Sequence, residues 1–176
     1  CYGSGKSIVS YHGAEPRFSI RYSISNNASV KFSYNRMRQY IQMLSNTTAI
    51  TPTDIWKLSD PYIQPQVGDQ ISVGFYKSTK KHSIDISIEN TVDFKNGAVL
   101  LLNPHIETDL VNANGKAYGA EFMIKKSAGK LNGWISYTYS RSFLQAKNTY
   151  PSETVNQGEY YPSSYDKPHA VNFIGN

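Results

Sequence analysis

Three acidic side chains come closest to a catalytic arrangement in this sequence of 176 residues. Asp85, Glu89 and Glu121 alternate with apolar residues in two strand-like segments, and paired carboxylates about 5–9 Å apart act as acid and base in glycoside hydrolysis. The sequence does not give their distance across strands, and charged positions on the wetted side of a sheet account for all three without chemistry. We therefore predict that the protein is not an enzyme.

The residues that could bind phosphate, act in a hydrolase or bind a metal ion do not have the spacing that those sites require. The segment Gly3–Ser7 resembles the end of a phosphate-binding loop, but the earlier glycine and the alternating strands and helices of that motif are missing from the sequence. Asp166 and His169 are not accompanied by a serine elbow. The histidines have neither His-x-x-x-His spacing nor a partner cysteine; they are His12, His82, His105 and His169. The sequence predicts no cofactor and no metal site.

Aromatic residues in the long connecting segments are the candidate ligand-binding residues. Exposed aromatic side chains on loops often form platforms on which ligands stack. They can equally pack the loops against one another or against a partner lipoprotein. The candidates are Trp56, Tyr62, Tyr160, Tyr161 and Tyr165.

The composition excludes several classes of protein. Hydrophobic residues make up 39% of the chain and charged residues only 18%, while Tyr alone occurs 14 times. An aromatic content of 13% supplies surface to bury, which argues against disorder, and a single cysteine excludes a disulfide scaffold. No run of 18 apolar residues occurs, so no transmembrane helix is expected. The net charge of +5 is spread along the chain, and we expect no nucleic-acid partner.

Apolar and polar residues alternate over much of the chain, which predicts antiparallel strands with one apolar and one polar face. The apolar residues of the early strands are Phe18, Ile20, Tyr22 and Ile24, then Ala28, Val30, Phe32 and Tyr34. Those of later strands are Ile71, Val73, Phe75, Ile84, Ile86, Ile88, Tyr118, Ala120, Phe122, Ile124, Ile135, Tyr137 and Tyr139. Residues 53–58 could form one helical turn at most.

The connections between these strands alternate in length. Short turns are expected at 26–27, 78–81 and 127–130, and longer connections at 45–69, 95–115 and 144–168. In an up-and-down sheet, this order places the short turns at one end and the long loops at the other. A soluble sandwich has no reason for such segregation, whereas an outer-membrane barrel has short periplasmic turns and long extracellular loops.

The strands match membrane-spanning strands in length and polarity. A tilted strand crosses the hydrocarbon layer in about 9–11 residues. The segments that meet or approach this length are 17–25, 28–44, 82–94, 116–126 and 131–143. Their polar sides carry charges that suit a wet lumen, and their other sides are aliphatic with Tyr near the ends, as in a lipid belt edged by aromatic girdles.

The segment 28–44 is expected to contain a β-bulge. Its apolar parity changes from Val30 and Phe32 to Met37 and the residues that follow. A bulge would move Arg36 and Arg38 off the lipid face.

Three motifs between residues 117 and 172 resemble the barrel of TonB-dependent outer-membrane receptors. Tyr118–Lys126 reads Y-G-A-E-F-M-I-K-K, and Leu131–Ser142 reads L-N-G-W-I-S-Y-T-Y-S-R-S. A long loop then ends in Tyr165–Asn172, which reads Y-D-K-P-H-A-V-N. In that family a Y-G-x-E strand, a tight turn, a G-W-x-S-Y-T-Y-S strand and a Y-D-[RK]-P-H loop end follow in this order. We expect His169, beside Pro168, to help fix the point where the chain re-enters a strand.

The resemblance implies a fold, a function and a location. Family members have a 22-stranded barrel with an N-terminal plug inside it, and they import siderophores, cobalamin, glycans or peptides through coupling to TonB. By this resemblance, residues 1–176 are about seven strands of an antiparallel, up-and-down transmembrane β-barrel in the outer membrane, and no segment resembles the plug. The expected partners are outer-membrane lipid, the remaining strands and plug of the same receptor, and TonB through that plug. A surface lipoprotein is a further candidate partner.

Two other interpretations stay open. One is a soluble β-sandwich that binds a ligand such as a glycan through the loop aromatics, with the stripe Ile84, Ile86 and Ile88 as its core. The other is a surface lipoprotein anchored through Cys1, which could be a lipid-bearing first residue or a chain boundary. The sequence stops within a strand-like run, so we expect the chain to be a fragment that needs further strands, because unpaired backbone groups in lipid cost several kcal/mol each.

Overall fold

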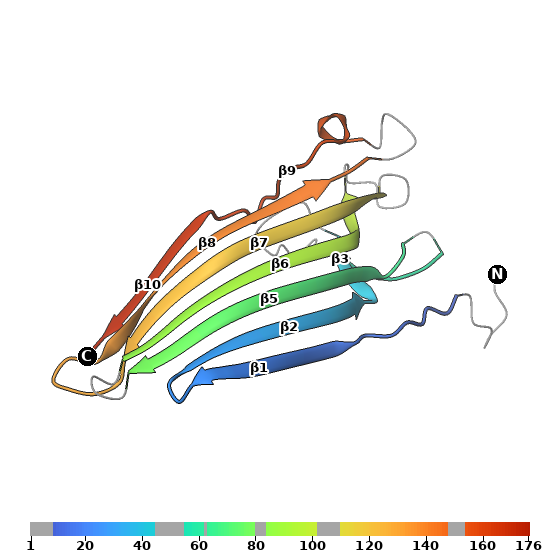
Figure 1. Ribbon diagram of the computed structural model, residues 1–176. Coiled ribbons are helices and arrows are strands. Elements are labelled where there is room, and N and C mark those ends of the chain that lie inside the picture. Colours follow the sequence, from blue (N-terminus) through green and yellow to red (C-terminus); the bar gives the residue numbers. More distant parts are fainter. Residues whose placement is uncertain (1–8, 45–54, 62, 80–83, 102–109, 148–153) are drawn as a thin grey trace.

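The computed structural model describes residues 9–44, 55–61, 63–79, 84–101, 110–147 and 154–176. Seven strands form one antiparallel path (Figure 1). In spatial order they are β1 (Arg17–Ser25), β2 (Ala28–Gln39), β5 (Gln66–Thr79), β6 (Ile84–Leu101), β7 (Leu110–Lys126), β8 (Gly133–Gln145) and β10 (His169–Gly175). The short β9 (Tyr161–Pro162) pairs with β8 and makes this an eight-stranded sheet. The predicted all-β, antiparallel fold is confirmed.

Three shorter elements lie outside this path. β3 (Ile41–Leu44) and β4 (Ile55–Leu58) pair with each other in a separate two-stranded sheet. A short 3-10 helix, η2 (Asn156–Gly158), precedes β9. Residues 53–58, the nearest candidate for a helical turn, are not helical where the structure describes them, because Ile55–Leu58 is a strand.

The strands run up and down, so their connections gather at two ends. Residues 26–27, 80–83 and 127–132 connect strands at one end, and residues 40–65, 102–109 and 146–168 connect them at the other (Figure 1). Every connection at the second end is longer than any at the first. The predicted segregation of short and long connections is therefore confirmed.

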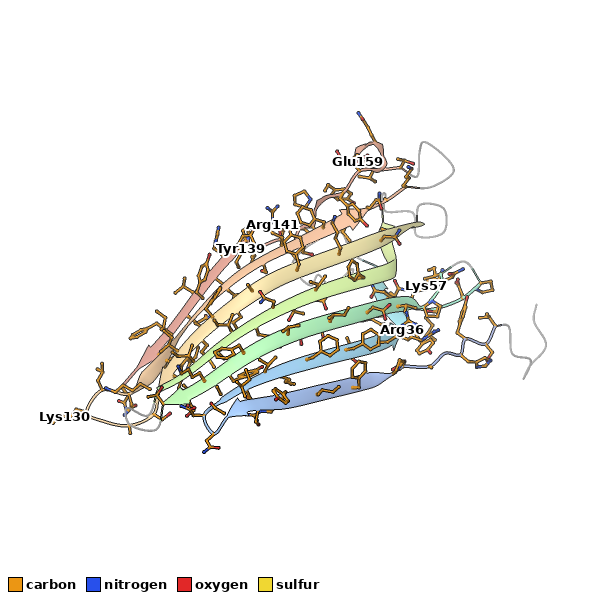
Figure 2. The ribbon with its side chains drawn as sticks, viewed as in Figure 1. Arg36, Lys57, Lys130, Tyr139, Arg141 and Glu159 are labelled. Carbon is orange, nitrogen blue, oxygen red and sulfur yellow. The ribbon has the colours of Figure 1, made fainter. Side chains whose placement is uncertain are left out.

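The cross-strand register keeps the predicted apolar residues on one side of the sheet, here called the apolar face. One row across all seven strands consists of Tyr22, Val30, Phe75, Ile88, Phe122, Tyr137 and Val171. The other side, the polar face, carries the row Arg21, Lys31, Gly74, Glu89, Glu121, Thr138 and Ala170. Side chains project from both sides of the single curved layer (Figure 2).

The apolar face is not covered by another layer of described residues. Tyr22 is 71% exposed, Val171 65% and Phe173 74%. Among the described residues, the buried hydrophobic side chains are Ile63, Ala113 and Ala146. The hydrophobic side chains that would normally form a core lie instead on an open surface.

The sheet is open in this chain. β1 and β10 form its two edges, and each pairs with a neighbour on one side only. No helix among the described residues is long and apolar enough to cross a membrane.

Two predicted features of the strands are wrong. The loop expected at 95–115 is mostly strand, because β6 reaches Leu101 and β7 begins at Leu110, with a register shift between Asn96 and Ala98. Asn114 and Gly115 pair with β6 on one side and with β8 on the other, and these ladder hydrogen bonds override the turn preference of an Asn-Gly pair. The expected bulge in β2 is also wrong, since its register with β5 runs unbroken from Ala28 to Gln39. Arg36 consequently stays on the apolar side, where Asp69 pairs with it.

We predict that Gly133→Ala separates β10 from β8. Gly133 has φ +151°, and a methyl group there would overlap the carbonyl oxygen of Ile174 on β10. Relief of that overlap requires a backbone shift, for which about 1–3 kcal/mol is expected. Amide hydrogen exchange should show faster exchange along residues 169–175. Lys130→Ala, in the adjacent turn, is the control, and equal protection of β10 in both variants would contradict the prediction.

Candidate functional site

An open hollow of ≈ 390 Å³ lies on the polar face beneath the segment that leads into β10. Carboxylates from β6 and β7 line it, together with hydroxyl groups from β8 and an aromatic ring from the preceding segment. The residues that define it are Glu89, Asp93, Glu121, Thr138, Ser140 and Tyr165. Its lining offers hydrogen-bond acceptors, hydroxyl groups and a ring face, which suits a polar ligand.

The register explains why these side chains meet. Glu89 on β6 lies directly opposite Glu121 on β7, and Tyr76 donates a hydrogen bond of 3.0 Å from its hydroxyl to Glu89 Oε2. Gly119 also lines the hollow, and a Cβ there would lie 2.8 Å from the carbonyl oxygen of Tyr139, so β8 approaches this position as closely as it does only because the residue is glycine. The Y-G-x-E motif thus places a glycine and a carboxylate side by side on the polar face.

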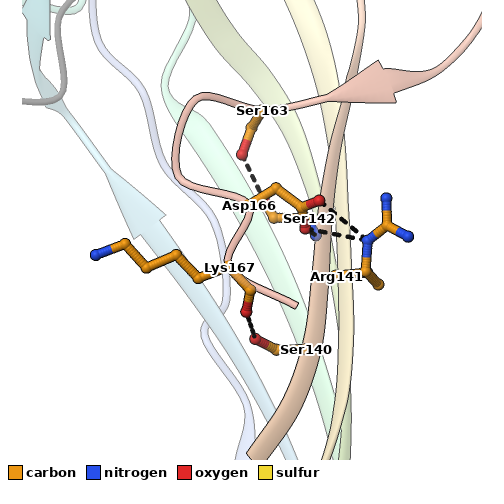
Figure 3. A network of polar contacts seen from close by, with 6 residues as sticks. All are labelled: Ser140, Arg141, Ser142, Ser163, Asp166 and Lys167. Atoms are coloured by element: carbon orange, nitrogen blue, oxygen red, sulfur yellow. Dashed lines mark hydrogen bonds and ion pairs between the residues drawn. The ribbon is translucent and has the colours of Figure 1, made fainter. Parts of the chain in front are cut away.

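The segment 163–168, called the re-entry segment, closes the edge of β8 above the hollow (Figure 3). β10 begins only at His169, opposite Tyr139, so β8 beyond this point needs other hydrogen-bond partners. Asp166 accepts a hydrogen bond of 2.7 Å from the backbone N–H of Ser142 and forms an ion pair of 3.0 Å with Nε of Arg141. The Asp166 side chain is only 8% exposed.

Further hydrogen bonds hold the re-entry segment along β8. The backbone N–H of Ser140 donates to the carbonyl oxygen of Pro168 at 3.1 Å, and the Ser140 hydroxyl donates to that of Lys167 at 3.0 Å. Ser163 donates from its N–H to the carbonyl oxygen of Ser142 at 2.9 Å. The edge groups of β8 are therefore satisfied by an irregular segment where regular pairing has ended.

His169 occupies the position predicted for it. It is the first residue of β10, and its Nδ1 lies 2.9 Å from the Tyr137 hydroxyl. Its ring stacks on Tyr137 with centroids 6.2 Å apart and lies 5.5 Å from the Tyr139 ring. These contacts fix the point where the chain re-enters the sheet. Among the described residues no group of three His, Cys, Asp or Glu side chains could hold a metal ion; His82 and His105 lie outside that part of the chain.

The predicted loop aromatics that the structure describes lie in different surroundings. Trp56, on β4, is 59% exposed, and Tyr165, at the hollow, is also 59% exposed. Tyr161 is half-buried in β9, and this burial raises the pKa of its hydroxyl. Tyr160 instead lies over a lysine of β7, and Tyr62 is outside the described residues.

Two residues that hold the re-entry segment against β8 were not predicted from the sequence. Asp166 and Arg141 were not among the predicted site residues, although they join the re-entry segment to β8. Glu89 and Glu121 were recognised only as charges on one face. Alignment of the stripes Ile86–Ile88 and Phe122–Ile124 would have placed these two carboxylates opposite each other, because residues at this spacing pair in the register.

A second polar group lies on the apolar side of the sheet, at the long-loop end. Arg36 binds both carboxylate oxygens of Asp69, at 2.7 and 2.8 Å, and the Tyr34 hydroxyl donates to Asp69 at 2.6 Å. The hydrogen bonds from Arg36 and then Tyr34 lower the pKa of Asp69 from 3.8 to about 2. The guanidinium charge of Arg36 is thereby balanced within the protein.

No family model, no curated protein and no solved structure matches this chain. Its function is therefore inferred from the two faces of the sheet, the hollow, the loop-end groups and the sequence motifs.

We predict that Asp166→Ala releases the re-entry segment. The change leaves the Ser142 N–H and Arg141 without their carboxylate, and an unsatisfied buried donor costs about 1–3 kcal/mol. Chemical denaturation should show a loss of this size, and hydrogen exchange should show faster exchange at the Ser142 amide. Ser164→Ala, an exposed change in the same segment, is the control. Unchanged exchange at Ser142 would contradict this role for Asp166.

We predict that Asp69 makes the free energy of unfolding depend on pH only at acid pH. Its folded-state pKa is lowered to about 2, so its contribution is fully present above the unfolded pKa near 4 and is lost as the pH falls through about 2. Arg36→Met should raise the pKa of Asp69 and shrink this acid-dependent change. The pKa can be followed by NMR titration of the Asp69 carboxyl carbon. An unchanged pKa in Arg36→Met would show that Arg36 does not cause the shift.

Proposed function

We propose that this chain forms part of the wall of a transmembrane β-barrel in a TonB-dependent outer-membrane receptor, and that it contributes to the capture and import of a nutrient. The observation that carries this proposal is the apolar face, which extends uncovered over seven strands.

The size of the apolar face supports a lipid environment. Seven strands at about 4.8 Å spacing make a surface about 30 Å wide. Four successive rows of mostly apolar side chains, about 7 Å apart along the strands, then cover roughly 600 Å². This area lies at the upper end of the largest apolar patches of soluble monomers, which are about 300–600 Å². Lipid would satisfy this face without any further protein layer.

The height of the apolar face fits the hydrocarbon layer. On β7 the apolar residues Tyr118, Phe122 and Ile124 lie between Lys116 and Lys126. These lysines are ten residues apart, which is about 34 Å along a strand. At the tilt of about 40–45° found in barrels, this gives a vertical height of about 25 Å, the height of the apolar band of outer-membrane barrels.

The polar features have a consistent place in such a wall. The polar face with its hollow would line a wet lumen, and the long connections and loop aromatics would lie on the extracellular side. A polar ligand captured there would contact the hollow at Glu121 and Tyr165. The open edges β1 and β10 would pair with further strands, because lipid offers no hydrogen bonds to bare edges.

The assignment to TonB-dependent receptors depends on the motifs of residues 118–172. Two of them have roles in the fold, since Gly119 and Glu121 shape the hollow and Asp166 to His169 attach the loop end to β8. The remaining barrel strands, the plug and TonB would be its partners, and a surface lipoprotein over the loops is a further one. Its location would be the outer membrane, and its role would be transport without covalent chemistry.

Labelling of cysteines along β7 tests the lipid contact. In a Cys1→Ser background, we place single cysteines by Glu121→Cys and Met123→Cys on the polar face, and by Phe122→Cys and Ile124→Cys on the apolar face. After reconstitution into vesicles, a water-soluble maleimide should label the first two and spare the last two. Bilayer lipid excludes the charged reagent from the apolar face, and labelling is read by mass spectrometry.

Unfolding in denaturant provides the control, because all four cysteines should then react equally. Equal labelling of both faces in vesicles would contradict the proposal. So would a monodisperse monomer near 19.8 kDa in plain buffer, measured by size-exclusion chromatography with light scattering. In that case the sandwich with ligand-binding loop aromatics would be the better interpretation.

A further inference from the structure

The apolar face ends at the long-loop side in a row of polar and aromatic residues. This border row consists of Arg36, Asp69, Phe94, Lys116 and Phe143, on β2, β5, β6, β7 and β8. Arg141 belongs to the next row toward the apolar residues, opposite Tyr118. Cationic groups on this face therefore lie directly beside the uncovered apolar surface, and Figure 2 labels Arg36 and Arg141 there.

Two cations and two rings of this region form a cluster, called the border cluster. Lys116 Nζ lies 4.0 Å from the centre of the Tyr160 ring and 5.8 Å from that of Phe143. The Arg141 guanidinium carbon lies 4.8 Å from the centre of the same Phe143 ring. Both cations are thus held against ring faces, at distances where cation–π attraction is significant.

The charge of the border cluster is only partly balanced. No ion pair joins Lys116 to another described residue. Arg141 uses Nε for Asp166, and its two terminal nitrogens point away from that carboxylate (Figure 3). Arg36 in the border row uses Nε and also a terminal nitrogen for its carboxylate partner, Asp69. The unpaired positive charge among the described residues of the cluster is therefore that of Lys116 on β7, while Arg141 on β8 adds guanidinium N–H groups beside its ion pair with Asp166.

We propose that the border cluster binds the phosphate-bearing headgroup of a membrane lipid whose acyl chains lie on the apolar face. This inference rests on the proposed function, since it requires that face to contact lipid. Phosphate oxygens would accept hydrogen bonds from the Lys116 ammonium and the Arg141 guanidinium. The acyl chains would run over Tyr118 and Phe122, which continue the same face toward the short-turn end.

The continuity of the two surfaces selects a lipid over a free anion. A free phosphate would use the cations alone and gain nothing from the exposed rings of Tyr118 and Phe122, which are 42% and 45% exposed. A lipid uses both surfaces at once. The rings of Phe143 and Tyr160 limit where the ammonium can move, which reduces the conformational entropy lost on binding.

Native mass spectrometry of the detergent-purified protein tests this inference. Phosphatidylglycerol and zwitterionic phosphatidylcholine are added in equal amounts, and the bound lipids are counted. Phosphatidylglycerol should bind preferentially, and Lys116→Met should weaken its binding about five-fold, as expected for the loss of one basic contact to an anionic lipid. Tyr160→Leu should shift binding in the same direction. Lys125→Met, on the same strand but on the polar face, should leave it unchanged.

Circular dichroism and the unfolding midpoint establish that each variant is folded. Equal affinities in the wild-type protein and Lys116→Met, or an equal loss in Lys125→Met, would overturn the inference. So would competition by inorganic phosphate at the same concentration as phosphatidylglycerol, because the ligand would then be a free anion. Flotation with phosphatidylcholine vesicles separates the two proposals. Insertion without a preference for phosphatidylglycerol would overturn only the headgroup site, whereas equal maleimide labelling of both faces in those vesicles would overturn both.

Discussion

The hydrogen-bonded ladder from β1 to β10 fixes the side of the sheet on which each side chain lies, and the other features depend on it. Because side chains alternate strictly along a strand, one continuous register sorts seven strands into two faces of opposite character. A single-residue slip between β6 and β7 would bring Glu121 into the apolar row. The hollow, the border row and the uncovered apolar face are all consequences of the same alignment.

β8 extends beyond the residues that pair with β10, so the backbone groups on its edge there need other hydrogen-bond partners. β10 stops pairing at Tyr139, yet β8 continues to Gln145. Asp166 supplies a charged acceptor to the Ser142 N–H, and charge-assisted hydrogen bonds are about twice as strong as neutral ones. One short segment thus completes the edge of the sheet and also forms a wall of the hollow.

The alternation of apolar and polar residues was sufficient to predict the two faces of the sheet, but not the contacts between strands and loops. The stripe Ile84–Ile88 and its counterparts identified the strands because period-two patterning is local. The strand length at Asn96 and Asn114 was missed because pairing with neighbours, which is not local, outweighed the turn preference. The same limit explains why a bulge was wrongly expected at Met37. It also explains why the ion pair of Asp166 with Arg141 was not predicted, because both features depend on which segment lies beside the strand.

The facing carboxylates Glu89 and Glu121 decide which side of the sheet must meet water. Two like charges about 5 Å apart repel by roughly 1 kcal/mol in water, and by several times more at lower dielectric. The open hollow and the Tyr76 hydroxyl reduce this cost on the polar face. The row of the apolar face that contains Ile88 and Phe122 carries no charged residue. The lipid-facing orientation proposed for the apolar face is therefore the one that both electrostatics and burial favour.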